Sequence, residues 1–152
     1  MALQVHPSTT LVPPHQEEAV LIDNAMVDLV RAIWARRWQT AACCQDTGEA
    51  VEAERNAVES VGEPTGNAGF IEYYRGWAWL KMPRGDALAL LSDLAADDQF
   101  REFVTTRWAQ GSWRLHTPVV WTGERFTITA FVQIHFPSNQ IIALTKALTP
   151  DE

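Results

Sequence analysis

The sequence predicts a single α+β domain, in which helices pack on one face of a mixed or mainly antiparallel sheet. The chain has 152 residues, of which 47% are hydrophobic and 20% charged, as is typical of one globular domain with a sizeable core. Three segments carry apolar residues at helical spacing, and two others alternate apolar and polar residues as strands do. Helices on one face of a sheet bury such a mixed order of elements best.

The first part of the chain predicts an arm followed by a strand and a helix. Residues 1–16 contain three prolines and are expected to form a flexible N-terminal arm, and residues 17–152 the domain. Residues 19–22 predict a short strand, after which Asp23 is expected to cap a helix. This helix spans 24–38, because its apolar residues lie on one face: Met26, Leu29, Val30, Ile33 and Trp34.

An acidic insertion separates two predicted strands. Residues 39–44 read as a strand of small residues, and 76–83 alternate and end at a proline, as a strand does. Between them, residues 46–69 contain six acids and one arginine and could include a short acidic helix. So long a connection inside a compact domain is usually functional, mobile or both.

The second half predicts a helix, a hairpin and a final helix. Residues 85–98 form the first helix, with Asp86 as its cap. Leu88, Leu91 and Ala95 are expected to face inward, with Leu90 and Leu94 nearby. Residues 112–121 and 126–136 form the two arms of a hairpin around the turn 122–125, and Pro118 indicates an edge strand or a bulge. The second arm alternates, with one face formed by Phe126, Ile128, Ala130, Val132, Ile134 and Phe136. Residues 137–148 form the last helix.

Charge and hydropathy argue against several classes of partner. The net charge is −7 and no run of Lys and Arg occurs, so direct nucleic-acid binding is not expected. No apolar stretch approaches the roughly 18–20 residues that cross a bilayer, so no membrane insertion is expected. The N-terminus lacks the features of a signal peptide, and we expect a cytoplasmic protein.

Cysteine is the most reactive residue type in the chain, and its two cysteines are adjacent. On a strand, Cys43 and Cys44 point to opposite faces, and one or both are expected to be small buried residues. The alternative is a small-ligand site or a thiol-dependent enzyme with a pocket around Cys44 and His135 as its base. A reactive thiolate needs nearby positive charge, whereas the residues after Cys44 are acidic. The sequence therefore favours a binding protein over an enzyme.

Neither a metal site nor a cofactor is expected. The candidate ligands are Cys43, Cys44, His116, His135 and acids of the 46–69 segment, and they lack the spacing of zinc sites. The acids match no calcium-loop pattern, and no phosphate-binding glycine motif occurs.

The sequence favours a small acidic accessory protein that binds a protein partner. Acids of the 46–69 segment would meet a basic surface, and the aromatic residues that follow would anchor the contact. The residues proposed for this surface are Asp46, Glu49, Glu52, Glu54, Tyr73, Tyr74 and Trp77. A homodimer through the hairpin edge or through exposed tryptophans is a further possibility.

Short motifs resemble a group of uncharacterised small α+β proteins of actinobacteria and of their phages and plasmids. In that group a helix ending in Leu-Trp-x-x-Gly leads to Thr-x-x-Ser-Cys-Gln, and Gly-Trp-Ala and Phe-Pro follow later. The matching residues here are Ile33, Trp34, Thr40, Cys44, Gln45, Gly76, Trp77, Ala78, Phe136 and Pro137, whereas Trp38 and Cys43 depart from the pattern. The resemblance implies a mobile-element or accessory origin. If the protein comes from a phage, its small size and acidic charge would fit a modulator of a host complex. It marks Thr40, Cys44 and Gln45 as the edge of a pocket and implies no reaction.

Overall fold

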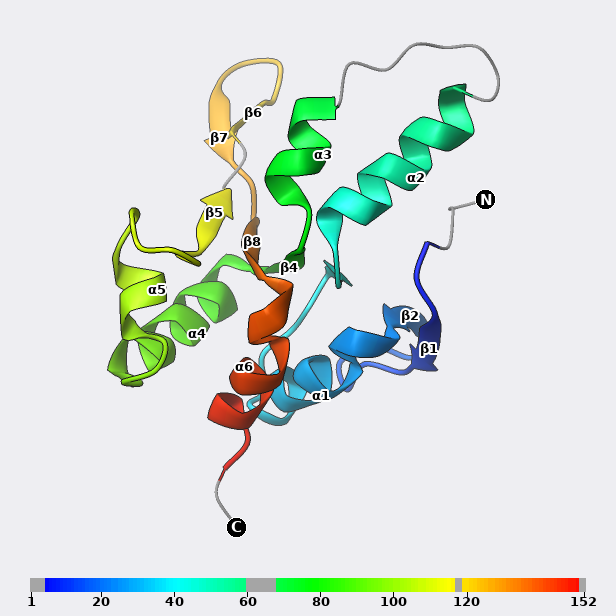
Figure 1. The fold of residues 1–152 in the computed structure, drawn as a ribbon. Coiled ribbons are helices and arrows are strands. Elements are labelled where there is room, and N and C mark those ends of the chain that lie inside the picture. Colours follow the sequence, from blue (N-terminus) through cyan, green and yellow to red (C-terminus); the bar gives the residue numbers. More distant parts are fainter. Residues whose placement is uncertain (1–4, 60–67, 117–118, 151–152) are drawn as a thin grey trace.

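The computed structural model describes residues 5–59, 68–116 and 119–150, and these form an α+β fold (Figure 1). The elements are β1 (Ser8–Leu11), β2 (Val20–Asp23), the 3₁₀ helix η1 (Asn24–Met26), α1 (Val27–Ala35), β3 (Ala42–Cys44), α2 (Thr47–Glu59), α3 (Ala68–Tyr74), β4 (Trp77–Pro83), α4 (Arg84–Ala96), α5 (Arg101–Thr105), β5 (Arg114–His116), β6 (Val119–Trp121), β7 (Phe126–Ile128), β8 (Phe131–Pro137), the 3₁₀ helix η2 (Ser138–Gln140) and α6 (Ile141–Leu148).

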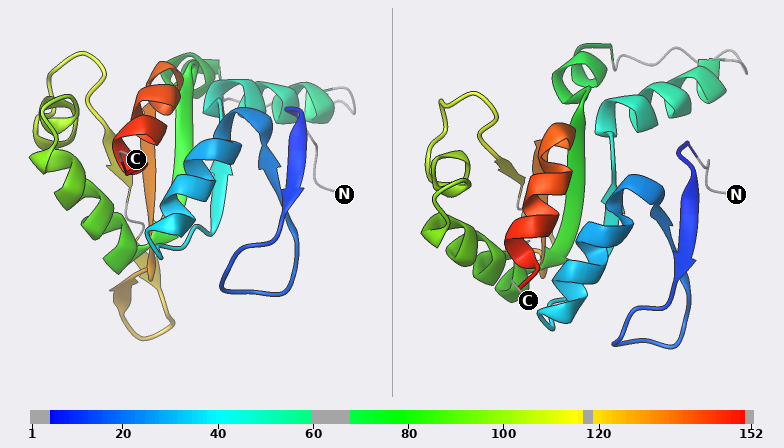
Figure 2. Two further views of the ribbon diagram at one scale, coloured as in Figure 1. Left: turned by 90° about the horizontal axis from the view of Figure 1, so that it is seen from below. Right: turned by 60° about the horizontal axis from the view of Figure 1, so that its bottom comes forward.

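An antiparallel sheet of four strands, in the order β3-β4-β8-β5, forms the centre of the fold. Alternate residues of its two long strands are buried: Ala78, Leu80 and Met82 on β4, and Val132, Ile134 and Phe136 on β8. Helices α1, α4 and α6 cover this face and complete the core, as predicted (Figure 2). Burial of this apolar surface is the main source of stability for such a fold.

The opposite face of the sheet carries larger and more polar residues. Trp79 and Lys81 on β4 are half-buried there, as is Gln133 on β8. His135 on the same face is buried, because the ring of Tyr74 at the end of α3 lies on it with 4.5 Å between ring centroids. Helix α3 therefore covers one end of this second face.

Part of the segment predicted to be a flexible arm forms a strand. Ser8–Leu11 pair antiparallel with Val20–Asp23 as β1 and β2. The backbone N–H of Asn24 also donates to the carbonyl of Pro7, at 2.8 Å. The prolines that suggested an arm lie before β1 and in the loop between the two strands, where no ladder hydrogen bond is required of them.

The acidic segment folds largely as helix. Helix α2 covers Thr47–Glu59 and α3 begins at Ala68; residues 60–67 lie outside the described part of the chain. Gly48 permits the two helices to approach closely, because a Cβ atom there would lie 2.6 Å from the backbone N and Cα of Arg75.

The buried face was predicted correctly for the first helix, whereas that of α4 is shifted by one residue from the prediction. The apolar residues predicted to face inward on α1 are all buried, from Met26 to Trp34. On α4, however, Ala87, Leu90 and Leu94 are buried, whereas Leu88 is 59% exposed. The inward placement of Leu88 was wrong because the buried stripe begins one residue earlier, in a helix that already starts at Arg84.

Neither predicted aspartate cap is used as a cap. Asp23 stands at the start of η1 but makes no side-chain capping bond. Asp86 lies inside the first turn of α4, where Oδ2 accepts the backbone N–H of Gln39 at 2.8 Å. Both carboxylates instead bind segments that are distant in the sequence.

The predicted hairpin is present but divided into two parts. Its base consists of β5 and β8 in the central sheet, and its tip of β6 and β7, which pair only with each other. We call residues 119–128, which include β6 and β7, the arm. It projects from the body in Figure 1 and in the left view of Figure 2. Pro118, where a bulge or edge was predicted, lies outside the described residues.

Candidate functional sites

Four side chains from separate segments meet at the edge of the sheet beside β3. They are His6 before β1, Asp23 at the end of β2, Cys44 at the end of β3 and Glu49 in the first turn of α2. Pairing of β1 with β2 sets His6 next to Asp23, and the end of β3 brings Cys44 to both. We call these four residues the His6 cluster.

The imidazole of His6 stands at the centre of this cluster. Its Nδ1 lies 3.0 Å from Asp23 Oδ2 and 3.9 Å from Cys44 Sγ, and its Nε2 lies 2.9 Å from Glu49 Oε2. His6 is only 7% exposed and the Asp23 side chain 17% exposed. The backbone N–H of Gln45 donates to Asp23 Oδ2 at 2.9 Å, which fixes the carboxylate.

Cys44 is a protonated thiol in this environment. Burial raises the pKa of Cys44 to about 12, and the nearby carboxylates of Asp23 and Asp46 add to the effect. The thiol donates to the carbonyl of Asp46 at 3.3 Å. A thiol held in its protonated form is a poor nucleophile, so the surroundings of Cys44 do not favour a thiol-dependent enzyme.

The imidazole beside Cys44 is that of His6, whereas His135 had been considered as its partner. Cys44 pairs with Trp79 on β4, and Trp79 pairs with His135 on β8, so a whole strand separates the two residues. His6 was missed because it lies in a proline-rich segment, 38 residues before Cys44. No local motif marks such a pairing.

The other residues predicted at this edge mostly hold the structure together. Thr40 Oγ1 accepts the indole N–H of Trp34 at 3.0 Å. The side-chain oxygen of Gln45 accepts the backbone N–H of Ala25, at 3.3 Å. Asp46 accepts two backbone N–H groups, one from the first turn of α2 and one from Gly76.

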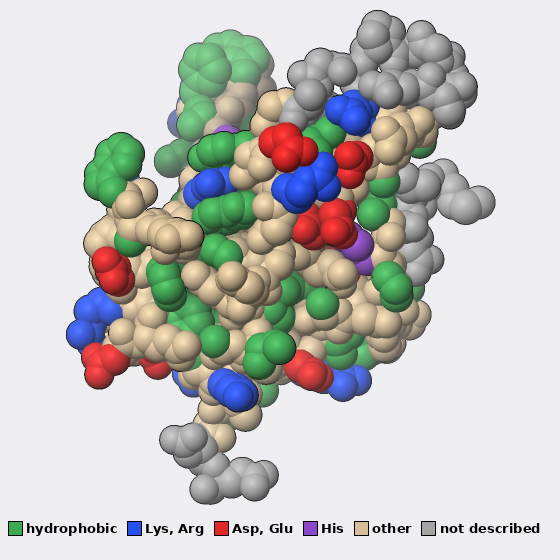
Figure 3. Space-filling view, in the orientation of Figure 1, with side chains coloured by type: hydrophobic (Ala, Val, Ile, Leu, Met, Phe, Trp, Pro, Cys, Tyr) green, Lys and Arg blue, Asp and Glu red, His purple; other side chains and the backbone are tan. Residues whose placement is uncertain are grey.

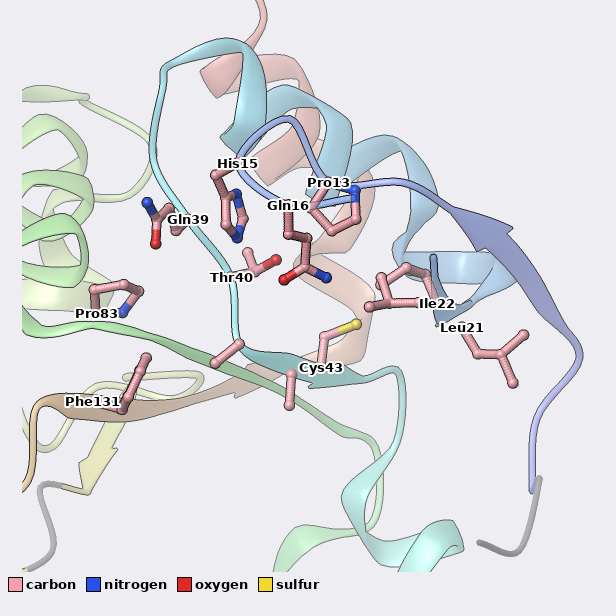
Figure 4. Close-up of a pocket in the computed structure, with 13 residues that line it drawn as sticks. Pro13, His15, Gln16, Leu21, Ile22, Gln39, Thr40, Cys43, Pro83 and Phe131 are labelled. Carbon is pink, nitrogen blue, oxygen red and sulfur yellow. The ribbon is translucent and has the colours of Figure 1, made fainter. Parts of the chain in front are cut away.

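A pocket of about 510 Å³ lies on the other side of β3, beside Cys43 (Figure 4). The loop between β1 and β2 covers it, and the side chains of His15 and Gln16 hang over Gln39 and Thr40. The sulfur of Cys43 points toward this space. Burial raises the pKa of Cys43 to about 12 as well, so its thiol is also protonated. Of the three residues predicted at a pocket edge, Thr40 lines this pocket, whereas Cys44 and Gln45 do not.

The predicted aromatic residues gather around one arginine. The guanidinium of Arg114 lies 3.8 Å from the ring centre of Tyr73 and 3.7 Å from that of Trp77, and one of its N–H groups donates to the carbonyl of Tyr73 at 2.9 Å. Tyr74 lies further away, at 5.4 Å. This arrangement fastens α3 to β4 and β5 through cation–π contacts.

The acids of α2 are partly neutralised within the chain. Arg75 makes two hydrogen bonds to Glu52, each 3.2 Å long, and it also contacts Glu72. Arg75 holds the pKa of Glu52 below its ordinary value. Glu49 contacts His6, and Glu54 is exposed. The acidic helix therefore presents less free charge than its composition suggests.

The arm exposes a continuous set of large apolar side chains. All six residues of β6 and β7 are exposed, among them Trp121 at 58% and Phe126 at 71%, whose rings lie 5.0 Å apart. In Figure 3 the arm is the pale group of hydrophobic atoms at the top, left of centre. The alternation places Phe126 and Ile128 on the same face as Val132 and Ile134, yet both are exposed, because the strand is interrupted at Thr129 and Ala130.

In the described part of the chain, no helix has the length and apolar character needed to cross a membrane. Comparisons with protein-family models, with curated proteins and with solved structures found no match for this chain.

Proposed function

We propose that this protein acts by binding a protein partner of net positive charge, with the arm as the apolar anchor of the contact. In a phage or mobile-element setting, such binding would modulate a host complex. The surface differs from the one expected from sequence, where the acids of 46–69 and the aromatic residues near 73–77 were favoured. Those aromatic rings hold Arg114, and Glu52 pairs with Arg75, so both sets have contacts within the chain.

The observation that carries the proposal is the exposure of the arm. An isolated two-stranded hairpin is at best marginally stable in water, and exposed apolar patches of this kind mark interaction sites. Trp121 and Phe126 are rigid aromatic side chains of the type that supplies most of the binding energy at interfaces. A partner that covers these two rings would bury the surface that the arm leaves in water.

Charge favours a different protein over a second copy of this chain. Two copies, each with a net charge of −7, repel one another at long range. A positively charged partner is attracted by the same field, which speeds the encounter and orients it. The partner is therefore expected to present an apolar groove with a basic rim.

The test compares three proteins: the wild type, a Trp121→Ser/Phe126→Ser variant and a Trp108→Ser control. Trp108 is 93% exposed and lies outside the arm, so the control removes a ring that is even more exposed than those of the arm. Proteins captured from the native host by the wild type would be purified, and their Kd for each variant measured at increasing salt concentration.

We expect to capture a basic protein that binds the wild type and the Trp108→Ser variant with equal Kd. Loss of both arm rings should weaken its binding by about 30-fold or more, as loss of a strong anchor does. Equal binding by the arm variant, failure to capture any basic protein, or binding that rises with salt would refute the proposal. Light scattering that shows a dimer of the wild type and a monomer of the arm variant would assign the arm to a second copy instead.

The pocket beside Cys43 supports a second candidate function, the binding of a small ligand. Its volume of about 510 Å³ lies within the range of ligand sites, and the polar groups of His15, Gln16, Gln39 and Thr40 line it. Thermal unfolding of the wild type and of a Gln16→Ala variant, each screened against small polar metabolites, would test this function. We expect at least one compound to raise the unfolding temperature of the wild type but not that of Gln16→Ala. An equal rise in both proteins would refute this second function.

A further inference from the structure

We infer that the His6 cluster is a zinc site, in which His6, Asp23 and Cys44 are the ligands and Glu49 orients the histidine. The three ligand atoms, Nδ1, a carboxylate oxygen and Sγ, all lie within 4.8 Å of one another. Imidazole nitrogen, thiolate sulfur and carboxylate oxygen are the ligand types that Zn²⁺ prefers. Metal binding goes beyond the protein contact proposed for the arm and does not depend on it.

The distances are those that a tetrahedral ion requires, after small side-chain adjustments. Ligand atoms about 2.0–2.3 Å from zinc lie roughly 3.3–3.7 Å from one another. Here Nδ1 of His6 lies 3.0 Å from Asp23 Oδ2, which is slightly shorter than this range, and 3.9 Å from Cys44 Sγ, which is slightly longer. Three protein ligands leave a fourth position for water or another donor.

The second nitrogen of His6 has the partner that metal-bound histidines have. Nε2 lies 2.9 Å from Glu49 Oε2, so a proton on Nε2 is donated to the carboxylate. In this tautomer Nδ1 carries no proton, and its lone pair faces Asp23 and Cys44. A carboxylate on the distal nitrogen of a ligating histidine is the usual outer-shell arrangement at zinc sites.

A neutral imidazole alone does not account for both carboxylates. It carries one N–H, so it can donate to Glu49 or to Asp23, but not to both. A cation between Nδ1, Asp23 Oδ2 and Cys44 Sγ satisfies all three atoms. The alternative is an imidazolium held between the two carboxylates, which would leave no ligand lone pair.

The backbone holds the ligands in place before any ion binds. Asp23 is fixed by the N–H of Gln45, and β1, which follows His6, is paired with β2. Zinc binding displaces the thiol proton of Cys44 to solvent and forms the Zn–S bond, with no change of oxidation state. Because the ligands come from three segments, the ion would tie the β1–β2 hairpin to the edge of the central sheet.

The adjacent cysteine provides a matched control. Cys43 lies on the opposite face of β3 and packs against the core, so Cys43→Ala removes a thiol that is not one of the three proposed ligands and leaves their side chains in place. The metal-free protein would be titrated with Zn²⁺ against a chromophoric chelator, and with Co²⁺ to detect the absorption of a thiolate–cobalt bond. The same titrations would be run on Cys43→Ala, Cys44→Ala, His6→Ala and Glu49→Gln, with circular dichroism as the check of folding.

One equivalent of zinc is expected to bind to the wild type and to Cys43→Ala, with the thiolate–cobalt absorption in both. Cys44→Ala should lose that absorption, His6→Ala should lose tight binding, and Glu49→Gln should bind about 10- to 100-fold more weakly. The wild-type titration decides the matter even if a variant unfolds. Failure of the folded wild type to bind zinc would overturn the site and favour the imidazolium, and retention of the cobalt absorption by Cys44→Ala would also overturn it.

Discussion

Replacement of His135 by Phe should remove much of the acid sensitivity of the fold. His135 is 6% exposed, with its ring against Tyr74, and its Nδ1 has no hydrogen-bond partner among the described residues. Burial, together with the nearby charges of Arg114 and His116, lowers the pKa of His135 to about 4 from an ordinary 6.5. Phenylalanine keeps a ring on Tyr74 and cannot be protonated.

The sign and the size of the effect follow from proton linkage. Because the pKa is lower in the folded state, the unfolded chain binds the proton more readily between these two pKa values. The contribution of His135 to stability is therefore complete above the unfolded pKa and is lost as the pH falls toward about 4. Between about pH 8 and about pH 5, the expected loss is about 2 kcal/mol of unfolding free energy.

Urea unfolding, followed by tryptophan fluorescence at several pH values, measures this loss. Between about pH 8 and about pH 5, the unfolding free energy of the wild type should fall by about 2 kcal/mol more than that of His135→Phe. This comparison does not depend on how far the two proteins differ in stability at neutral pH. Replacement of the exposed His15, which is not among the groups that act on His135, by Gln is the matched control and should leave this loss in place. Parallel pH profiles of the wild type and His135→Phe would refute the reasoning.

Three further predictions concern packing and the thiols. Gly48→Ala should cost about 1–3 kcal/mol of unfolding free energy, because its Cβ would press on the Arg75 backbone, whereas Gly69→Ala meets no atom and should be neutral or stabilising. Equal unfolding midpoints would contradict this. Arg114→Ala should cost about 1–2 kcal/mol in the same assay through loss of its contacts with two rings, and Arg114→Lys should cost less. Alkylation of Cys44 followed by mass spectrometry should be about a thousandfold slower in the folded than in the unfolded chain, because its pKa rises from 9.0 to about 12; similar rates would exclude a protonated thiol.

The core could be predicted from sequence because its signals are local. The apolar stripe of α1 and the alternation of β4 and β8 each depend on residues a few positions apart, and both match the buried faces. The fold class followed from the order of these elements. The limits of β3 and the inward face of α4 were less certain, because small residues and a run of leucines fit more than one face.

The His6 cluster could not be predicted in the same way, since its members are linked only by tertiary structure. Asp23 precedes a helix, so its position suggests a cap, yet its carboxylate accepts from Gln45 and faces His6. His6 itself lies in a segment that reads as unstructured until β1 pairs with β2. Cys44 and Glu49 were both singled out, but for different roles, and only the fold shows that they border the same imidazole.

The arm shows where a local pattern and the tertiary fold diverge. The alternation that buries Val132, Ile134 and Phe136 continues in register back to Phe126, although the chain joins the sheet only at Phe131. Within the sheet these apolar residues stabilise the fold, whereas in the arm they lie in water and contribute little to the stability of the chain. Polar residues would suit an exposed hairpin better, both for solubility and against aggregation. The apolar residues of the arm are therefore best explained by a contact with another molecule, and this is why the proposed function rests on the arm rather than on the acidic helix.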